Sequence, residues 1–147
     1  MPRLVEFSID FLHRSWNWLN DPEIKSLTMT PDFTKEEQLA FFEKLPGMND
    51  YWIRGVVEDN IPVGAVGLKH INTESAEYWG YIGEKQFWGK GIGNFIIQQA
   101  ITKAKELGLK ELYLFVDEHN HKAKQLYLRT SFRIDSPGKM EKYRLSL

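Results

Sequence analysis

The spacing of apolar residues changes along the chain, and in the first third it is the spacing of helices. After a short strand at residues 4–8, a helix is expected to open at Asp10, and Pro22 is expected to start a second one. Thr34 and Glu37 stand three apart ahead of an apolar run, the spacing of a capping box. Three helical segments are therefore predicted before residue 50.

From Tyr51 the apolar residues have the spacing of β-strands. Two runs of β-branched and apolar residues flank Asp59 and Asn60, which predicts a hairpin with a two-residue turn. A third strand is predicted at residues 77–83. On a regular strand Glu77 shares one face with the aromatic residues two and four positions later.

The second half predicts strand, helix, strand, helix and a terminal hairpin. The helix ends at Gly108, and its apolar face consists of Ile92, Ile96, Ile97, Ala100, Ile101, Ala104 and Leu107. A buried strand at 110–116 follows, then a helix opened by Asn120 and a hairpin around Pro137 and Gly138. We expect an α/β (α+β) fold with a mixed, mostly antiparallel sheet of six to seven strands flanked by helices.

Composition narrows the possible functions. The 147 residues, without a repeat or linker, predict a single domain spanning 1–147. With 19 basic and 20 acidic side chains the net charge is -1, which indicates neither nucleic acid nor an anionic membrane as a partner. There is no cysteine, so an acyl-cysteine intermediate is excluded. No signal peptide or membrane span is evident, and a cytoplasmic location is expected.

One glycine-rich stretch, QFWGKGIGNF at residues 86–95, stands where the helix of the second half begins. It fits neither a phosphate loop that ends in Gly-Lys-Ser/Thr nor the Gly-x-Gly-x-x-Gly dinucleotide fingerprint. Glycines at a strand-to-helix turn do let backbone N–H groups approach an anion, where the helix dipole adds positive charge. From this pattern alone, an anion site and a tight packing turn remain equally good interpretations.

A second motif favours the anion site. Asn120, Ala123 and Tyr127 follow at a helix start, with Ala123 and Tyr127 on one face. Together, Gln86-x-x-Gly89-x-Gly91 and Asn120-x-x-Ala123-x-x-x-Tyr127 resemble the GNAT superfamily of acetyl-CoA-dependent N-acetyltransferases. The resemblance is strongest between residues 77 and 132. Ser131-Phe132 departs from the family's usual Gly-Phe and puts the local turn geometry in question.

The resemblance implies acetyl-CoA as the acetyl donor and a sheet that splays where this cofactor enters. Its pyrophosphate would lie on backbone N–H groups from Phe87 to Asn94, where a Cβ at 89, 91 or 93 would occupy the phosphate position. An N–H near Tyr81 or Ile82 would polarise the thioester. The cofactor-binding residues predicted are Tyr81, Ile82, Gln86, Phe87, Trp88, Gly89, Lys90, Gly91, Ile92, Gly93, Asn94, Asn120 and Lys124. Lys122 and Arg129 are further candidates for the 3′-phosphate, or they form a solvated helix face.

Direct attack by an amine requires an acid and, for some acceptors, a base. Tyr127 is the candidate acid, because an ordinary tyrosine is protonated at neutral pH and can donate to the leaving thiolate. Glu77 is the first candidate base, and a solvated carboxylate at a strand end is the competing interpretation. His70 and His119 are reserves. No metal is expected, since the His-containing run at 117–121 lacks a third clustered ligand.

The acceptor is the least determined part. Two short stretches, WLNDPEI at residues 18–24 and YIGEKQFWGKGIG at residues 81–93, resemble two branches of the superfamily. These branches act on nucleotide-linked amino sugars and on ribosomal-protein N-termini. Abundant aromatic residues favour a small-molecule amine, an amino sugar or its nucleotide-linked form, with Lys69, Arg54 and Arg14 available for a diphosphate. A protein N-terminus is the main alternative. A non-catalytic acyl-CoA-binding module, a purely structural interaction domain and a homodimer all stay open.

Overall fold

The computed structural model describes residues 1–147 and contains one seven-stranded sheet with the order β1-β2-β3-β4-β5-β7-β6. The strands are β1 (Arg3–Val5), β2 (Trp52–Glu58), β3 (Ile61–Lys69), β4 (Ser75–Ile82), β5 (Glu111–Asp117), β6 (Arg133–Ser136) and β7 (Met140–Ser146). Neighbouring strands are antiparallel except for β4 and β5, which are parallel. The predicted mixed, mostly antiparallel sheet is confirmed.

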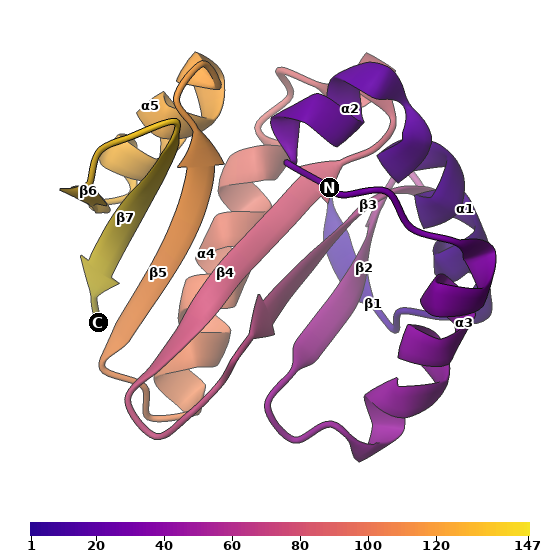
Figure 1. Ribbon diagram of the computed structural model, residues 1–147, viewed down its shortest axis with the longest axis horizontal. Coiled ribbons are helices and arrows are strands. Elements are labelled where there is room, and N and C mark those ends of the chain that lie inside the picture. Colours follow the sequence, from indigo (N-terminus) through magenta and orange to yellow (C-terminus); the bar gives the residue numbers. More distant parts are fainter.

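Five helices flank the sheet: α1 (Ile9–Asn20), α2 (Pro22–Leu27), α3 (Lys35–Lys44), α4 (Ile92–Glu106) and α5 (His121–Arg129). Two short 3₁₀ turns, η1 (Leu45–Gly47) and η2 (Lys85–Phe87), complete the elements. Figure 1 shows α4 crossing behind the sheet, while α1, α2 and α3 gather on the side of β2 and β3. None of the helices combines the length and the hydropathy that a bilayer crossing demands.

Local signals in the sequence account for several of these boundaries. The Thr34 hydroxyl accepts from the Glu37 N–H, and the Glu37 carboxylate accepts from the Thr34 N–H, so the predicted capping box is confirmed. Asp59 and Asn60 both have positive φ, 52° and 62°, as a two-residue hairpin turn requires.

The main core lies between the sheet and α4. It is a cluster of 18 buried residues, to which α4 contributes Ile92, Ile96, Ile97, Ala100 and Ala104 of the predicted face. Ile101 packs against this cluster, but the prediction was wrong for Leu107, which is exposed just beyond the end of α4. A smaller cluster of Phe11, Trp18 and Val57 lies under α1. The sheet is thus covered on both faces, but by different helices.

The sheet forks between its two parallel strands. Residues pair only from Ser75↔Glu111 to Glu77↔Tyr113. Beyond these three positions β4 stays paired with β3, and β5 stays paired with β7, while β4 and β5 separate (Figure 1). The fork leaves the upper half of each strand with one edge free of a strand partner, so the predicted splay of the sheet is present.

Candidate active site

The glycine turn leads from β4 into α4. Gly89 and Gly91 have φ of 75° and 82°, in the left-handed region that side chains other than glycine rarely adopt. Nothing lies within 4 Å of where a Cβ at either position would stand. The backbone conformation therefore explains the glycines, and the space in front of the turn is open.

Backbone donors without an internal acceptor follow one another along this turn. The first N–H in α4 with an intrahelical acceptor belongs to Phe95, which donates to Gly91 at 3.2 Å. The N–H groups of residues 89–94 make no hydrogen bond in the structure. Six consecutive free donors at a helix N-terminus, beside the positive end of the helix dipole, suit an anion such as a diphosphate.

The start of this free stretch differs from the prediction. The N–H groups of Phe87 and Trp88 are already used, because they close the η2 turn onto Glu84 and Lys85, both at 3.0 Å. Phe87 packs against the main core, and the Trp88 indole donates to the Ile82 carbonyl at 2.8 Å. The available donors therefore begin at Gly89 rather than at Phe87.

Other predicted members of the cofactor site have internal partners. The Gln86 amide donates to Glu84 at 3.3 Å, and Ile92 is buried in the core. A Cβ at Gly93 would meet Leu126 of α5 at 3.5 Å, an ordinary van der Waals contact, so neither space nor backbone conformation requires a glycine there. Asn94 and Lys90 are exposed on the turn.

The fork brings the predicted thioester region next to this turn. Tyr81 and Ile82 stand at the end of β4, paired with β3 on one side and with no strand on the other. Main-chain groups on an unpaired edge can take an added extended segment as a further strand. The edge without a strand partner runs from Tyr78 to Ile82, and at its upper end the Ile82 carbonyl already accepts from the Trp88 indole.

The α5 helix begins across the fork. The side-chain oxygen of Asn120 caps the helix by accepting from the Ala123 N–H at 3.4 Å. The side-chain NH₂ group of Asn120 donates to the backbone carbonyl of Leu27 at 3.4 Å. Lys124 is tied down: its amine donates to the Glu118 carbonyl at 2.8 Å and pairs with Glu141 at 3.3 Å. A phosphate bound by Lys124 would have to compete with that carboxylate.

Tyr127 lies on the face of the sheet that carries α4. Its ring contacts Tyr78, Phe132 and Tyr143 at centroid distances of 6.3, 6.0 and 6.2 Å. Burial raises the pKa of Tyr127 to about 12. Its hydroxyl makes no hydrogen bond, yet it is not among the atoms sealed from solvent. A half-buried, protonated donor without a hydrogen-bond partner thus stands beside the fork.

Glu77 lies on the opposite face, at the base of the fork. The register aligns Lys69, Glu77 and Tyr113 in one row across β3, β4 and β5. The Lys69 amine lies 3.6 Å from the Glu77 carboxylate, whose side chain is only 15% exposed. Burial, and after it the charge of Glu77, raises the pKa of Tyr113. Glu77 and Tyr127 therefore approach the fork from its two faces.

These features have a known counterpart. A sequence model described as the acetyltransferase (GNAT) family matches residues 12–132, which is most of the chain. The chain belongs to the GNAT family.

Solved GNAT structures share the whole fold. The spermidine N-acetyltransferase of Vibrio cholerae, solved with CoA and spermine, superposes with a TM-score of 0.88 at 23% identity, covering 99% of this chain and 95% of that one. The N-acetyltransferase PseH of Campylobacter jejuni, solved with acetyl-CoA, gives 0.77 at 22% identity, covering 99% of both chains.

A curated relative gives a similar result in sequence. GCN5-related N-acetyltransferase 6 of Arabidopsis thaliana, a chloroplastic protein, is 32% identical over 95 residues, which is 62% of this chain and 33% of the relative. The chain spans a third or less of the length of the curated relatives it matches.

The other residues considered for a base, a metal or a diphosphate do not form a second site in this GNAT chain. His119 is exposed and lies 3.3 Å from Glu118. No three His, Asp or Glu side chains come together as a metal site would require. The three cations considered for a diphosphate have separate partners: Lys69 pairs with Glu77, Arg14 pairs with Asp10, and Arg54 lies over the Trp52 ring. The strand register also puts Lys69 and Arg54 on opposite faces of the sheet.

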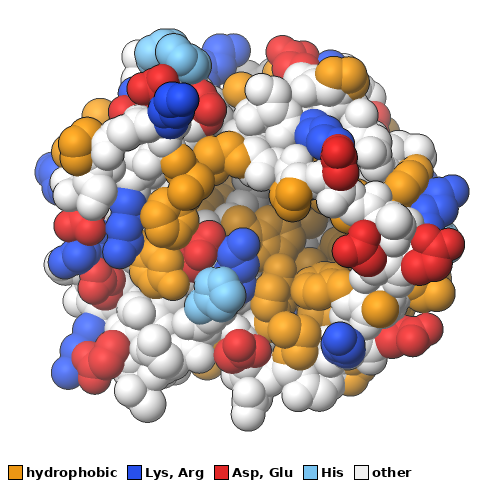
Figure 2. All heavy atoms as spheres, in the orientation of Figure 1, with side chains coloured by type: hydrophobic (Ala, Val, Ile, Leu, Met, Phe, Trp, Pro, Cys, Tyr) orange, Lys and Arg blue, Asp and Glu red, His pale blue; other side chains and the backbone are white.

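The sequence did not predict which side chains surround Glu77 on its face of the sheet. Figure 2 shows a hollow in this face with hydrophobic side chains inside it and charged groups at its rim. Tyr51, Trp79 and Tyr81 contact one another on this side of the sheet. The sequence indicated only that aromatic residues are abundant, because which of them meet on this face depends on the register of β2, β3 and β4.

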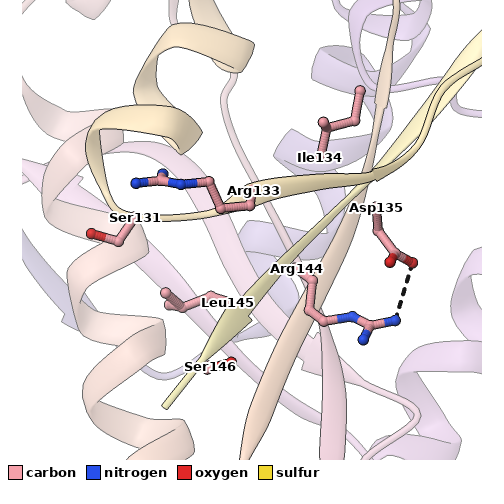
Figure 3. A pocket seen from close by; sticks show the side chains of 7 residues that line it. All are labelled: Ser131, Arg133, Ile134, Asp135, Arg144, Leu145 and Ser146. Atoms are coloured by element: carbon pink, nitrogen blue, oxygen red, sulfur yellow. Dashed lines mark hydrogen bonds and ion pairs between the residues drawn. The ribbon is translucent and has the colours of Figure 1, made fainter.

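Another hollow, of about 370 Å³, lies at the far edge of the sheet beside β6 and β7 (Figure 3). Arg144 on its wall is already paired, with Glu111 at 2.7 Å and with Asp135 at 3.1 Å. Its remaining lining is Ser131, Arg133, Ile134, Leu145 and Ser146. It holds none of the motif residues and is not part of the candidate active site.

Proposed function

We propose that this GNAT chain transfers the acetyl group of acetyl-CoA directly to the primary amine of a small molecule, and that the acceptor is an amino sugar. The observation that carries the proposal is the conjunction of six free backbone donors at residues 89–94 with the adjoining open edge of β4. An anion site beside a free strand edge matches a molecule with a diphosphate and an extended amide-bearing arm.

Binding residues follow from that geometry. The diphosphate would be held by the donors between Gly89 and Asn94, and the pantetheine arm by the open edge of β4 up to Tyr81. With no cysteine in the chain, the amine nitrogen attacks the thioester carbon itself. The new C–N bond replaces the C–S bond, one proton leaves the amine, and the products are an amide and the CoA thiol.

Tyr127 is the proposed donor to the departing sulfur. With a pKa of about 12 it is protonated throughout the neutral range. Complete transfer of its proton to a thiolate with a conjugate-acid pKa near 8.5 would be uphill by roughly 5 kcal/mol. The hydroxyl is therefore proposed to stabilise the developing thiolate as a hydrogen-bond donor, the role for which a fixed, desolvated donor is suited.

Glu77 is the proposed acceptor for the amine proton. It stands where β4 and β5 part, on the face that carries the hollow, which would let an amine bound in the hollow reach it. Its partner Lys69, at 3.6 Å, keeps its charge compensated while leaving its carboxylate partly exposed. An amine of low pKa, near 8, is already partly neutral at pH 7 and needs little help from such a base.

The aromatic hollow supports an amino sugar. Flat rings with polar edges cover the apolar faces of sugars, and Tyr51, Trp79 and Tyr81 supply three of them next to Glu77. Because Lys69, Arg14 and Arg54 do not converge, the free sugar is favoured over its nucleotide-linked form. A peptide N-terminus, whose α-amine is equally easy to deprotonate, is the competing acceptor.

The test is a thiol-release screen with acetyl-CoA and a panel of amino sugars, nucleotide-linked amino sugars, N-terminal peptides, spermidine and lysine. We expect release with an amino sugar, and Tyr127→Phe to lower kcat about 10²- to 10⁴-fold with little change in acetyl-CoA affinity.

Tyr143→Phe is the matched control, because its hydroxyl is bound to Glu141 at 3.1 Å and its ring also contacts Tyr127. It should keep kcat within about threefold. Release with peptides and no sugar would refute the amino-sugar acceptor. Binding of acetyl-CoA without release for any amine would refute catalysis.

A further inference from the structure

A continuous row of five aromatic rings lines one side of the hollow face. Trp18 of α1 contacts Tyr81, Tyr81 stacks on Trp79, Trp79 contacts Tyr51, and Tyr51 contacts Phe41 of α3. The centroid distances are 6.1, 6.3, 6.4 and 5.3 Å in that order. We call these five residues the aromatic wall.

One atom of the wall lacks a partner. The Trp79 indole lies flat on Gly67 of β3, where a Cβ would stand 2.6 Å from the ring. Its Nε1 is the single buried side-chain nitrogen or oxygen in the chain without a hydrogen bond. An unsatisfied buried donor costs about 1–3 kcal/mol, so such a group calls for an explanation.

The neighbour that can use this donor is the Tyr51 hydroxyl. It forms no hydrogen bond in the structure, and unlike the indole nitrogen it is not sealed from solvent. Burial raises the pKa of Tyr51, and the adjacent Trp79 indole acts in the opposite direction, as an N–H group facing the phenol oxygen does. The two side chains are neighbours, with ring centroids 6.4 Å apart, but no well-aligned hydrogen bond joins them.

The chemistry of the pair fixes a direction. An indole N–H can only donate, so Tyr51 is the acceptor in any bond between them, and the Tyr51 proton must point away from Trp79. The hydroxyl then keeps its own proton for a second acceptor, and a ligand can reach it because its oxygen is not sealed from solvent. A donor held in this way is satisfied by an oxygen on the ligand and not by an ammonium group, which has no lone pair.

We propose that Tyr51, supported by Trp79, is the specificity-determining donor that binds an oxygen of the acceptor. This inference rests on the proposed function. The site then takes a primary amine that also carries a hydroxyl, carbonyl or carboxylate oxygen, such as a hexosamine or an α-amino carbonyl compound, in preference to an alkyl polyamine.

Charge on the same face agrees with this selection. A polyamine carries several cations and gains most from several carboxylates without partners. Glu77, at the foot of the aromatic wall, is already paired with Lys69 at 3.6 Å. The carboxylate nearest the Tyr51–Trp79 pair is thus already neutralised, and the other carboxylate that touches the wall, Glu84, accepts from the Trp18 indole at its far end.

The experiment measures amine binding and turnover separately. Ligand-observed NMR in the presence of CoA gives the affinity of wild type, Tyr51→Phe and Trp79→Phe for glucosamine, an alanyl dipeptide, cyclohexylamine and spermidine. Thiol release with acetyl-CoA then gives kcat and KM for the same amines. Trp52→Phe removes an indole that packs on the main core instead of the aromatic wall, and it serves as the matched control.

For wild type we expect glucosamine or the dipeptide to bind more tightly than cyclohexylamine and spermidine. Tyr51→Phe should lower the affinity for the oxygen-bearing amine by about three- to tenfold, the effect of one hydrogen bond. Its kcat should stay within about twofold of the wild-type value. Trp79→Phe should act in the same direction, and the double variant should lose less than the product of the two single effects.

Three results would overturn the proposal. Wild type could bind spermidine most tightly, wild type could bind none of the four probes, or Tyr51→Phe could lower the affinity for cyclohexylamine as much as that for glucosamine. Equal losses for all amines would mean that Tyr51 acts on the fold or on Glu77. Oxygen-selective binding without thiol release would sustain the assignment of Tyr51 and refute the proposed catalysis, so the two failures are distinguishable.

Discussion

The Phe132 N–H donates to the Tyr127 carbonyl at 3.0 Å and closes the C-terminus of α5. This bond is possible because Ser131, between them, has φ of 75° and occupies the left-handed region usual for glycine. The departure from Gly-Phe noticed in the sequence therefore leaves the turn intact. It also makes Ser131 a strained residue one turn from Tyr127, the proposed hydrogen-bond donor to the thiolate.

Ser131→Gly should relieve that strain. We expect the free energy of unfolding to rise by about 1 kcal/mol, the left-handed penalty less the added flexibility of glycine in the unfolded chain. Urea unfolding measures it. Ser131→Ala keeps the strain and is the control, with an expected change within about 0.5 kcal/mol. Equal effects of glycine and alanine would show that the backbone conformation at 131 costs nothing.

The buried tyrosines predict an alkaline loss of stability. Burial raises the pKa of Tyr51, Tyr78, Tyr81 and Tyr127, so each binds its proton more tightly in the folded state than in the unfolded one, where the pKa is near 10. Their contribution is complete below pH 10 and is lost as the pH rises above it, by up to about 1.4 kcal/mol per pH unit for each tyrosine.

Urea titrations at pH 9, 10 and 11 test this sign. Wild type should be stable up to pH 10 and lose stability steeply beyond it. Tyr127→Phe lacks one of the four groups and should show a shallower loss between pH 10 and 11. A slope in Tyr127→Phe as steep as in wild type would contradict the burial of that hydroxyl.

Gly67 is predicted to be essential for the aromatic wall. Gly67→Ala places a methyl group 2.6 Å from the Trp79 ring, which must move, and we expect a loss of about 1–3 kcal/mol of stability. Indole fluorescence should also change. Gly47→Ala, at a glycine with nothing within 4 Å, is the control. A Gly67→Ala variant as stable as Gly47→Ala would show that the indole is loosely held.

Short-range signals in the sequence were sufficient for much of the fold. The Thr34 capping box, the Asp59-Asn60 turn and the apolar face of α4 were predicted because each depends on residues a few positions apart. The same holds for the glycine turn, whose left-handed residues at 89 and 91 are visible as glycines.

Contacts between distant segments could not be predicted in this way. The pairing of Lys124 with Glu141 depends on how β7 returns beside α5, and the packing of Gly93 on Leu126 depends on how two helices approach. The meeting of Tyr51 with Trp79 requires the register of three strands, which shifts side chains to the other face if it slips by one residue. The pattern of one strand does not contain that register.

The central claim is that the glycine turn binds the diphosphate of acetyl-CoA, and calorimetric titration of Gly91→Glu tests it most directly. The variant places a carboxylate and a side chain in the open space before the free donors of residues 89–94. Gly47→Glu adds the same side chain at another unobstructed glycine. We predict that wild type and Gly47→Glu bind acetyl-CoA with similar affinity and that folded Gly91→Glu does not bind it; equal binding by all three would contradict the account.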